Sequence, residues 1–559
     1  MAGCDFTKPL LPSSDRLLQT SAEPQVVIIV PDGDLASSES AISKLQNQRE
    51  NHLNGCQIEI ENPYKIIGAR DFVVPTTSTI DPFRNHTPKI EGFYEWLKII
   101  IMIPIVFIRL LLFALFISIG FISTKFALGG WKDKQNPMPR WRCRLMWVTR
   151  VCARGILFSF GYHWIKRKGR PAPREIAPIV VSNHVSYIDP IFFFYELFPT
   201  IVSSESHDSI PFVGTIIRAM QVIYVNRFCP LSRKNAVNEI KRKASSNRFP
   251  RLLLFPEGTT TNGRLVISFQ LGAFIPGYSV QPVIVRYPYV HFDQSWGNIA
   301  LAKLMFRMFT QFHNFMEVEF LPVVSPLENQ KESAACFAER TARTIANTLN
   351  VSQTCYSYGD FMLLAKASEL KQDNPSVYMV EMARPELKSH ISSMEAVDFL
   401  ETFISMNPDA SGSIKIDDFI KGLRLWPCAL SEKIFRFLDV QRRGRISFKQ
   451  FLLGSANVLK QPLFRKACEL AFVECSSAGN HLISESELGE FIRLAVPEMK
   501  TCEIHGLFTL FDRDRDGRIS REDFIVGLRR NPLLIALFLP LLTPTALDQA
   551  ALPTIMVAI

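Results

Sequence analysis

The sequence lacks the features of a secreted or a nucleic-acid-binding protein. Its 11 cysteines are scattered without paired spacing, so we expect reduced thiols in a cytosol-facing protein rather than disulfides or zinc sites. It has no zinc-finger or RNA-binding signature, which removes nucleic acid from the expected partners. Its first residues show no charged stretch followed by an apolar one, so we expect no cleavable signal peptide.

Length and charge indicate several domains and a membrane surface. A chain of 559 residues is long enough for two to four domains, and its hydrophobic fraction of 47% is that of a globular protein. The net charge of +10 is concentrated between Lys125 and Arg174, beside an apolar run. A basic belt in that position favours an anionic membrane surface as a partner.

The first part of the chain divides into a polar arm and an apolar anchor. Residues 1–60 are polar with little periodicity, which predicts a disordered arm. Residues 61–150 are predicted to anchor the chain, because Ile99–Thr124 is almost wholly apolar and long enough to cross a hydrocarbon core of about 30 Å. Arg109 is its only charge and Pro104 can kink it, so we prefer a hairpin within one leaflet to a single tilted span. A buried soluble helix is the remaining alternative.

The segment after the apolar run mixes aromatic and basic side chains, as segments that lie on a membrane do. These residues are Trp131, Trp141, Trp147, Lys132, Lys134, Arg140, Arg142 and Arg144. Fewer basic residues precede the apolar run, so the positive-inside rule places the domains that follow it in the cytosol.

Residues 151–350 alternate short apolar runs with helical stretches, which predicts an α/β domain with a mostly parallel sheet. An apolar run that stops at a polar turn is typical of a buried strand. The expected strands are Ile179–Val181, Ile201–Ser203, Val222–Val225, Leu252–Phe255 and Val283–Arg286. The expected helices between them are Phe192–Phe198, Val213–Ala219 and Ser232–Ser245.

The octapeptide Asn183–Pro190 is the strongest candidate for chemistry. His184 and Asp189 are five residues apart, and on a continuous helix they would point about 140° away from each other. A strand, a turn and a helix that starts with Asp189 as N-cap and Pro190 at its first position would let them meet. A carboxylate that fixes an imidazole makes a general base. The simpler alternative is that Asp189 only caps the helix.

A second polar turn, Phe255–Gly263, also follows an apolar run, Leu252–Leu254. Turns that follow two parallel strands can share one edge of a sheet, which is where open α/β folds place their sites. We therefore expect the two turns to form one site.

Residues 355–530 repeat helix, glycine-centred loop and helix four times, which predicts an all-α EF-hand domain. The loop Asp512–Asp523 fits the calcium template best, with modest affinity because its last ligand position is Asp rather than Glu. The loop Asn407–Asp418 is weaker. In the second loop Arg443 stands at a ligand position, so we expect this loop not to bind calcium. In the third loop His481 replaces the turn glycine, which makes calcium binding there doubtful. The candidate ligands are Asp512, Asp514, Asp516, Arg518 and Asp523 in the fourth loop, and Asn407, Asp409, Ser411, Ser413 and Asp418 in the first. The alternative is that all four loops are scaffolding.

The tail, residues 531–559, is apolar but interrupted by Pro532, Pro540, Pro544 and Pro553. Proline lacks the amide donor that a helix needs, so we expect no regular membrane-spanning helix there.

His-x-x-x-x-Asp followed by Phe-Pro-Glu-Gly-Thr resembles two sequence blocks of the glycerolipid acyltransferase superfamily. Gly214–Arg227 and Val280–Val283 are similar to two further blocks of that family. With an apolar segment before these blocks and EF-hands after them, the chain to about residue 530 resembles the EF-hand-bearing plant lysophosphatidylethanolamine acyltransferases, relatives of the animal lysophosphatidylcholine acyltransferases. Thr260 stands where animal relatives often have Cys, which leaves the headgroup preference open.

The resemblance implies an α/β acyltransferase domain, preceded by a membrane helix or hairpin and followed by an all-α EF-hand domain. It implies transfer of an acyl chain from acyl-CoA to the free hydroxyl of a lysophospholipid, with His184 as base and Asp189 as its partner. The substrate-binding residues would be Arg227, Glu257, Gly258, Thr259 and Pro282.

The resemblance also implies no cofactor for the chemistry, calcium at the EF-hand loops, and a place on the endoplasmic reticulum, Golgi or late endosome with the catalytic domain facing the cytosol. Two alternatives stay open. One is acylation of lysophosphatidic acid or glycerol 3-phosphate. The other is a calcium-responsive membrane adaptor whose acyltransferase domain is inactive.

Overall fold

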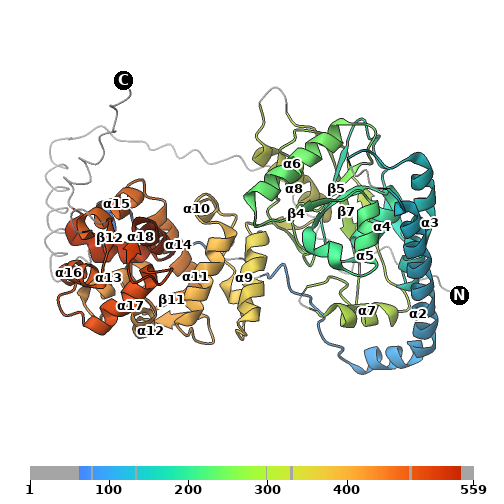
Figure 1. Ribbon diagram of the computed structural model, residues 1–559. Helices are drawn as coiled ribbons and strands as arrows, with labels where there is room; N and C mark the ends of the chain where they lie inside the picture. Colours follow the sequence, from blue (N-terminus) through green and yellow to red (C-terminus); the bar gives the residue numbers. More distant parts are fainter. Residues whose placement is uncertain are drawn as a thin grey trace, which may run out of the picture. The chain divides into compact units, whose positions relative to one another are not determined.

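The computed structural model describes residues 62–542, apart from residues 77, 79, 132–134, 298, 328–330 and 477–480. The predicted arm, residues 1–60, lies outside the described residues, and so does the tail from residue 543 onward. Figure 1 shows two long helices, an α/β domain that follows them along the chain, and a C-terminal region built mainly of helices with short strands between them.

A seven-stranded sheet forms the centre of the α/β domain. Each pair of neighbouring strands is parallel except β7 and β8, which confirms the mostly parallel sheet that the sequence predicts. In spatial order the strands are β1 (Lys166–Lys168), β8 (Glu317–Phe320), β7 (Val280–Arg286), β2 (Ile179–Ser182), β5 (Leu252–Leu254), β3 (Thr200–Ser204) and β4 (Ile223–Val225).

Alternate side chains of the central strands pack on opposite faces, because successive residues of a strand point to opposite sides. On one face Val180 packs with Phe192 and Phe193, which belong to α4 (Ile188–Leu197). On the other face Ile179 and Val181 belong to a separate cluster. That cluster is supplied by α6 (Pro230–Ser245) and α8 (Ala334–Leu349). The sheet is therefore covered on both sides, as a parallel sheet requires.

The apolar segment forms one uninterrupted helix, α2 (Phe93–Leu128), which runs through Pro104. The hairpin that we preferred from the sequence is therefore wrong. By length and composition, α2 is the one helix of the described chain that could cross a membrane. The next helix, α3 (Arg140–Ser159), packs along it. The hydroxyl of Thr124 on α2 lies 3.1 Å from the hydroxyl of Thr149 on α3. Large apolar side chains stay exposed along α2, among them Ile100, Phe107, Leu111 and Phe126.

Arg109 is buried against the α/β domain, which explains how the apolar helix α2 tolerates a charge at its centre. Its guanidinium donates to the carbonyl of Phe309 at 2.7 Å and to two further carbonyls just beyond it. These carbonyls lie at the end of α7 (Leu301–Phe309), where a helix leaves acceptors unsatisfied. The arginine therefore fastens α2 to the α/β domain.

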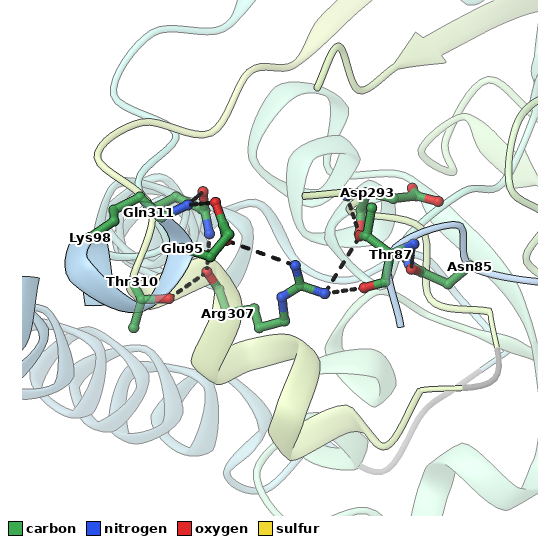
Figure 2. Close-up of polar contacts among 8 residues, drawn as sticks. All are labelled: Asn85, Thr87, Glu95, Lys98, Asp293, Arg307, Thr310 and Gln311. Atoms are coloured by element: carbon green, nitrogen blue, oxygen red, sulfur yellow. Dashed lines mark hydrogen bonds and ion pairs between the residues drawn. The ribbon is translucent and has the colours of Figure 1, made fainter. Parts of the chain in front are cut away.

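A buried polar network fastens the start of α2 in the same way (Figure 2). Glu95 accepts from Lys98 at 2.5 Å and lies 4.0 Å from the guanidinium of Arg307. Arg307 also donates to the carbonyl of Thr87, in the segment before the helix. Lys98 reaches Gln311 at 2.8 Å. The segment before α2 and the first turns of α2 are thus bonded to the α/β domain.

The C-terminal region is built of helix pairs whose loops associate two by two. The first loop pairs with the second through the antiparallel strands β10 (Ser413–Lys415) and β11 (Arg445–Ser447). The third pairs with the fourth through β12 (Leu482–Ile483) and β13 (Ile519–Ser520). The helices around them are α11 (Ser393–Ser405), α12 (Ile416–Gly422), α13 (Ala429–Leu438), α14 (Phe448–Leu459), α15 (Phe464–Cys475), α16 (Glu485–Ala495), α17 (Thr501–Phe511) and α18 (Arg521–Arg530).

Two segments from outside the four loops complete the core of this helical region. The first part of the apolar tail is a buried 3-10 helix, η6 (Pro532–Leu541), so the described part of the tail forms no regular membrane-spanning helix, as expected. Near the other end of the described chain, Tyr64 packs in the same core, and its hydroxyl donates to the carbonyl of Leu533 at 2.9 Å. The first described residues therefore pack on the helical region, whereas the apolar part of the predicted anchor is α2.

Candidate active site

The register of the sheet brings the two polar turns to one edge. Val181 on β2 pairs with Leu254 on β5 in parallel register. His184 and Glu257 each follow three residues later, so they leave the sheet at the same level. This edge is the carboxyl edge of the parallel strands, where ligands bind in open α/β folds. The expectation that the two turns meet is confirmed.

His184 and Asp189 are in direct contact. Nδ1 of His184 lies 2.8 Å from Oδ2 of Asp189, and the carboxylate is completely buried while the imidazole keeps partial exposure. The same oxygen accepts the backbone N–H groups of Val185 at 2.8 Å and Ser186 at 3.0 Å. A carboxylate held by three donors cannot turn away, so the imidazole has a fixed orientation with Nε2 left for substrate.

The prediction that Asp189 caps the helix is wrong by two positions. Helix α4 begins at Ile188 with Tyr187 as its N-cap, so Asp189 lies within the first turn. Its carboxylate folds back onto the turn before the helix because the N–H groups of Val185 and Ser186 are free to bond it.

Tyr287 is a site residue that the sequence interpretation missed. It follows β7 directly, and its hydroxyl donates to Oδ1 of Asp189. Burial, together with the charge of Asp189, raises the pKa of the Tyr287 phenol well above its usual value, so the phenol stays a donor. Its place immediately after an apolar strand was the available signal, and the same rule had identified the other two turns.

Glu257 is buried and has an unusual acidity. Its side chain is 1% exposed, and its Oε2 accepts from the hydroxyl of Thr261 at 3.1 Å. Burial raises the pKa of Glu257 to about 8, in opposition to the hydrogen bonds from Thr261 and the His184 backbone. The backbone N–H of Thr261 also donates to the carbonyl of His184 at 2.7 Å, which ties the two turns together.

Gly258 and Thr259 lie half-buried in the turn after Glu257. Gly258 has φ of +78°, a conformation that other residues rarely adopt, and its N–H donates to the carbonyl of Phe255. Phe255 in turn stacks on the imidazole of His184, with ring centroids 4.1 Å apart. The backbone of the turn at Gly258 is thus held close to the imidazole of His184 through Phe255.

Arg227 lies in the loop after β4, the edge strand on this side of the sheet. Its guanidinium lies over the ring of Tyr358, 4.7 Å from the centroid. Nearby is His207, which the sequence interpretation also missed and whose Nδ1 lies 2.9 Å from the hydroxyl of Ser203. Partial burial lowers the pKa of His207, and the charges of Arg227 and His184 lower it further. Arg227, His184 and His207 therefore lie near enough to one another for their charges to interact.

Pro282 does not join these residues. It is buried within β7, opposite Val181 and before the strand reaches the carboxyl edge. It precedes the first residue that pairs with β8, Val283, so its missing N–H interrupts no bond of that ladder. The structure therefore places Pro282 inside the sheet, apart from the other predicted substrate-binding residues, and its substrate-binding role stays a prediction.

The turn Phe255–Gly263, called the catalytic turn below, is also contacted by the chain before α2. The side-chain amide of Asn262 donates to the carbonyls of Asp81 at 2.8 Å and Arg84 at 3.0 Å. The side chain of Asp81 also accepts from the hydroxyl of Ser376 of the C-terminal region at 2.5 Å. Residues 81–84 therefore lie between the turn and the C-terminal region.

The fourth EF-hand loop has the geometry of a calcium site. Ligand oxygens of Asp512, Asp514 and Asp516 lie within 4.8 Å of one another. Oδ1 of Asp512 is buried and has no hydrogen-bond partner, which a bound cation would satisfy. Gly517 makes the expected turn with φ of +81°. Asp523 is not part of this cluster, because its carboxylate bonds Ser520 at the start of α18.

The first loop is less suited to a cation. Asp409 accepts the N–H groups of Ser411 and Ser413 and forms an ion pair with Arg445 of the second loop. Asp418 lies in the first turn of α12, and Asn407 adopts φ of +54°. Within the ranges that the structure describes, the fourth loop is the single cluster of three acidic or metal-binding side chains. The ion pair makes us expect weaker binding here.

Comparison with known proteins identifies the family to which this chain belongs. Residues 165–286 match the acyltransferase family, and residues 488–531 match the EF-hand domain pair. Lysophospholipid acyltransferase LPEAT2 of Arabidopsis thaliana is 59% identical over 546 residues, which cover 98% of this chain and 100% of that protein. Human lysophosphatidylcholine acyltransferase 1 is 30% identical over 400 residues, 70% of this chain and 74% of its own length. The chain belongs to the lysophospholipid acyltransferase family.

A solved structure shows a more distant likeness. The 1-acyl-sn-glycerophosphate acyltransferase PlsC of Thermotoga maritima is 18% identical, with a TM-score of 0.33, and covers 43% of this chain and 95% of that one.

Proposed function

We propose that this protein transfers an acyl chain from acyl-CoA to the free hydroxyl of a lysophospholipid, with lysophosphatidylethanolamine favoured and lysophosphatidylcholine close behind. The observation that carries the proposal is the His184–Asp189 pair at the carboxyl edge of the sheet, beside the buried Glu257. The membership of the chain in a lysophospholipid acyltransferase family supports the same chemistry.

In this mechanism His184 acts as the general base. With Nδ1 bonded to Asp189, Nε2 accepts the proton of the lysophospholipid hydroxyl as its oxygen attacks the thioester carbonyl of acyl-CoA. The tetrahedral intermediate collapses, the C–S bond breaks, and the imidazolium returns the proton to the CoA thiolate. Asp189 stabilises the imidazolium, and Tyr287 holds the second oxygen of Asp189. No cofactor takes part in these steps.

The acceptor is held by groups that surround the base. Arg227 binds the phosphate of the lysophospholipid, as a planar guanidinium does well. Backbone N–H groups of the turn at Gly258 and Thr259 support the developing oxyanion. Glu257, neutral near pH 7 because its pKa is about 8, orders this turn through Thr261.

We propose that α2 lies on one leaflet and does not cross the membrane. The segment before it bonds the α/β domain through Thr87, whose carbonyl accepts from Arg307. The helix after it, α3, bonds the same domain through Arg150, which donates to the carbonyl of Tyr195 at 2.8 Å. A crossing would place these two flanks on opposite sides of the bilayer. The expected membrane is that of the endoplasmic reticulum, Golgi or late endosome, with the catalytic and EF-hand domains in the cytosol.

Two glycosylation sequons test this topology. Asn85 is completely buried, and its amide donates to the carbonyls of Asp293 and Ser295, so a glycan there is incompatible with this fold. Asn350 is exposed at the end of α8. We expect neither to carry an endoglycosidase-sensitive sugar. A glycan on Asn350 would place the active site in the lumen and refute the assignment.

Purified protein tests the reaction directly. Labelled oleoyl-CoA is supplied with lysophosphatidylethanolamine, lysophosphatidylcholine, lysophosphatidic acid or glycerol 3-phosphate. We expect labelled diacyl product from the first two, and loss of about 10²- to 10⁴-fold in rate for His184→Ala with membrane binding retained. Product only from the last two would favour the alternative acceptors. No product from any would favour the calcium-responsive adaptor.

A further inference from the structure

The ring that covers Arg227 comes from outside the predicted catalytic range of residues 151–350. Tyr358 is the first residue of α9 (Tyr358–Glu369), the helix that leads toward the EF-hands. It reaches the active site because β9 (Ser352–Gln353) pairs with β6 (Leu265–Val266), which follows the catalytic turn. The N–H of Ser268 then donates to the carbonyl of Tyr356 at 2.7 Å.

Tyr358 contacts both the turn and the arginine. Its Cβ lies 3.6 Å from the position that a Cβ on Gly258 would occupy, so the side chain packs against the catalytic turn. Cζ of Arg227 lies 4.7 Å from the centre of its ring. An arginine stacked on an aromatic face is attracted to the ring electrons and loses the freedom of a long side chain.

The Tyr358 ring is held in place by α9 and by the residues that pack against this helix. Ser357 caps α9, and the buried carboxylate of Asp360 accepts the backbone N–H groups of three residues, Val380, Glu381 and Met382. Tyr358 stacks on Phe361 with ring centroids 6.1 Å apart. The ring is therefore a rigid support instead of a mobile cover.

The charge of Arg227 is available for a ligand. Across the described parts of the chain, no carboxylate forms an ion pair with its guanidinium, which instead lies over the Tyr358 ring. The nearby His207, whose pKa the charge of Arg227 lowers, adds no anion. A cation that is positioned but not neutralised is suited to a phosphate.

We propose that Tyr358 is a positioning residue, which holds the guanidinium of Arg227 in place for the phosphate of the acceptor lipid. The acceptor site is then completed by the first helix of the C-terminal region. This inference rests on the proposed function, in which Arg227 binds that phosphate.

The test compares a variant that keeps the ring with one that loses it, in the intact protein. Tyr358→Phe keeps the ring and removes the hydroxyl, whereas Tyr358→Leu keeps apolar packing against Gly258 and removes the ring. Rates are measured against the mole fraction of lysophosphatidylethanolamine in mixed micelles, and separately against oleoyl-CoA. We expect Tyr358→Phe to match wild type. We expect Tyr358→Leu to raise the KM for the lysophospholipid about fivefold to tenfold, with kcat and the KM for oleoyl-CoA within about twofold.

A double variant asks whether Tyr358 acts through Arg227. In an Arg227→Ala background, the change Tyr358→Leu should raise the KM for the lysophospholipid no further, because the supported group is gone. A purely structural role would lower activity equally in both backgrounds. Thermal unfolding identifies misfolding, and Tyr358→Met serves as a second ring-free variant.

Several outcomes would overturn the inference. Equal KM values for the Phe and Leu variants would show that the ring face has no role. Additive effects of Tyr358→Leu and Arg227→Ala would show that Tyr358 acts independently. Both results are distinct from failure of the proposed function, in which wild-type protein transfers no acyl chain to any lysophospholipid, and that failure would remove this inference as well.

Discussion

Replacing Glu257 by Gln should make the protein more stable, by an amount that grows with pH. Burial raises the pKa of Glu257 from an ordinary 4.5 to about 8. Between these values the unfolded chain releases the proton and the folded protein keeps it, so stability falls as pH rises. Above pH 8 both states are ionised and the loss is complete. Gln has the shape of the protonated acid, can accept from Thr261 and does not titrate.

The size of the effect follows from the interval between the two pKa values. Each unit corresponds to about 1.4 kcal/mol, so wild type loses about 5 kcal/mol between pH 4.5 and pH 8 through this one group. Near pH 5 the two proteins should unfold at similar temperatures. At pH 8 the Glu257→Gln protein should unfold at a temperature higher by about 10–20 °C, given that 1 kcal/mol shifts the midpoint by about 2–4 °C in a domain of this size.

Tryptophan fluorescence of detergent-solubilised protein during heating measures this difference at a series of pH values. Every other titrating group is present in both proteins, so the difference between them isolates Glu257. Glu339→Gln makes the same chemical change at an exposed site on α8 and should follow wild type at each pH. A Glu257→Gln protein whose advantage stays constant from pH 5 to pH 8 would refute a buried neutral acid.

Two further changes test the other parts of the site. Tyr287→Phe removes the hydrogen bond to Asp189 and should lower kcat about tenfold to a hundredfold, since a bond to a charged group contributes about 1.5–3 kcal/mol. Steady-state rates at saturating acyl-CoA measure it, and unchanged kcat would contradict the role of Tyr287. Asp512→Ala together with Asp516→Ala removes two of the three clustered carboxylates and should abolish the principal calcium heat in calorimetry of the full chain, while unchanged heats would exclude the fourth loop.

Local patterns predicted the parts of the site that follow directly from strands. His184, Asp189 and Glu257 lie in turns after apolar runs, and the parallel register brings such turns to one edge whatever the rest of the fold does. The predicted helix at residues 213–219 is also observed as α5 (Val213–Ala219). Tyr287 follows the same rule, but a tyrosine after a strand is common in cores, so its type gave no indication of chemistry.

Long-range packing decided the parts that the sequence could not predict. Arg109 and Pro104 favoured a hairpin because an isolated charge is costly in lipid. The carbonyls that satisfy Arg109 come from the end of α7, about two hundred residues later in the chain. Likewise, no pattern near Tyr358 links it to Arg227, because the strand pairing of β6 with β9 brings the two together.

The buried charges at the start of α2 explain why the chain before that helix folds with the α/β domain. Arg307 is 1% exposed, and its charge is met by Glu95 at 4.0 Å and by the carbonyl of Thr87 (Figure 2). A buried charge that loses its partner costs about 3–5 kcal/mol. The free energy of unfolding of a domain is only about 5–15 kcal/mol, so this loss is a large share of it. The α/β domain therefore depends on residues 87–95. The alternation of strands and helices begins only at residue 151. We infer that the catalytic folding unit begins earlier, before α2.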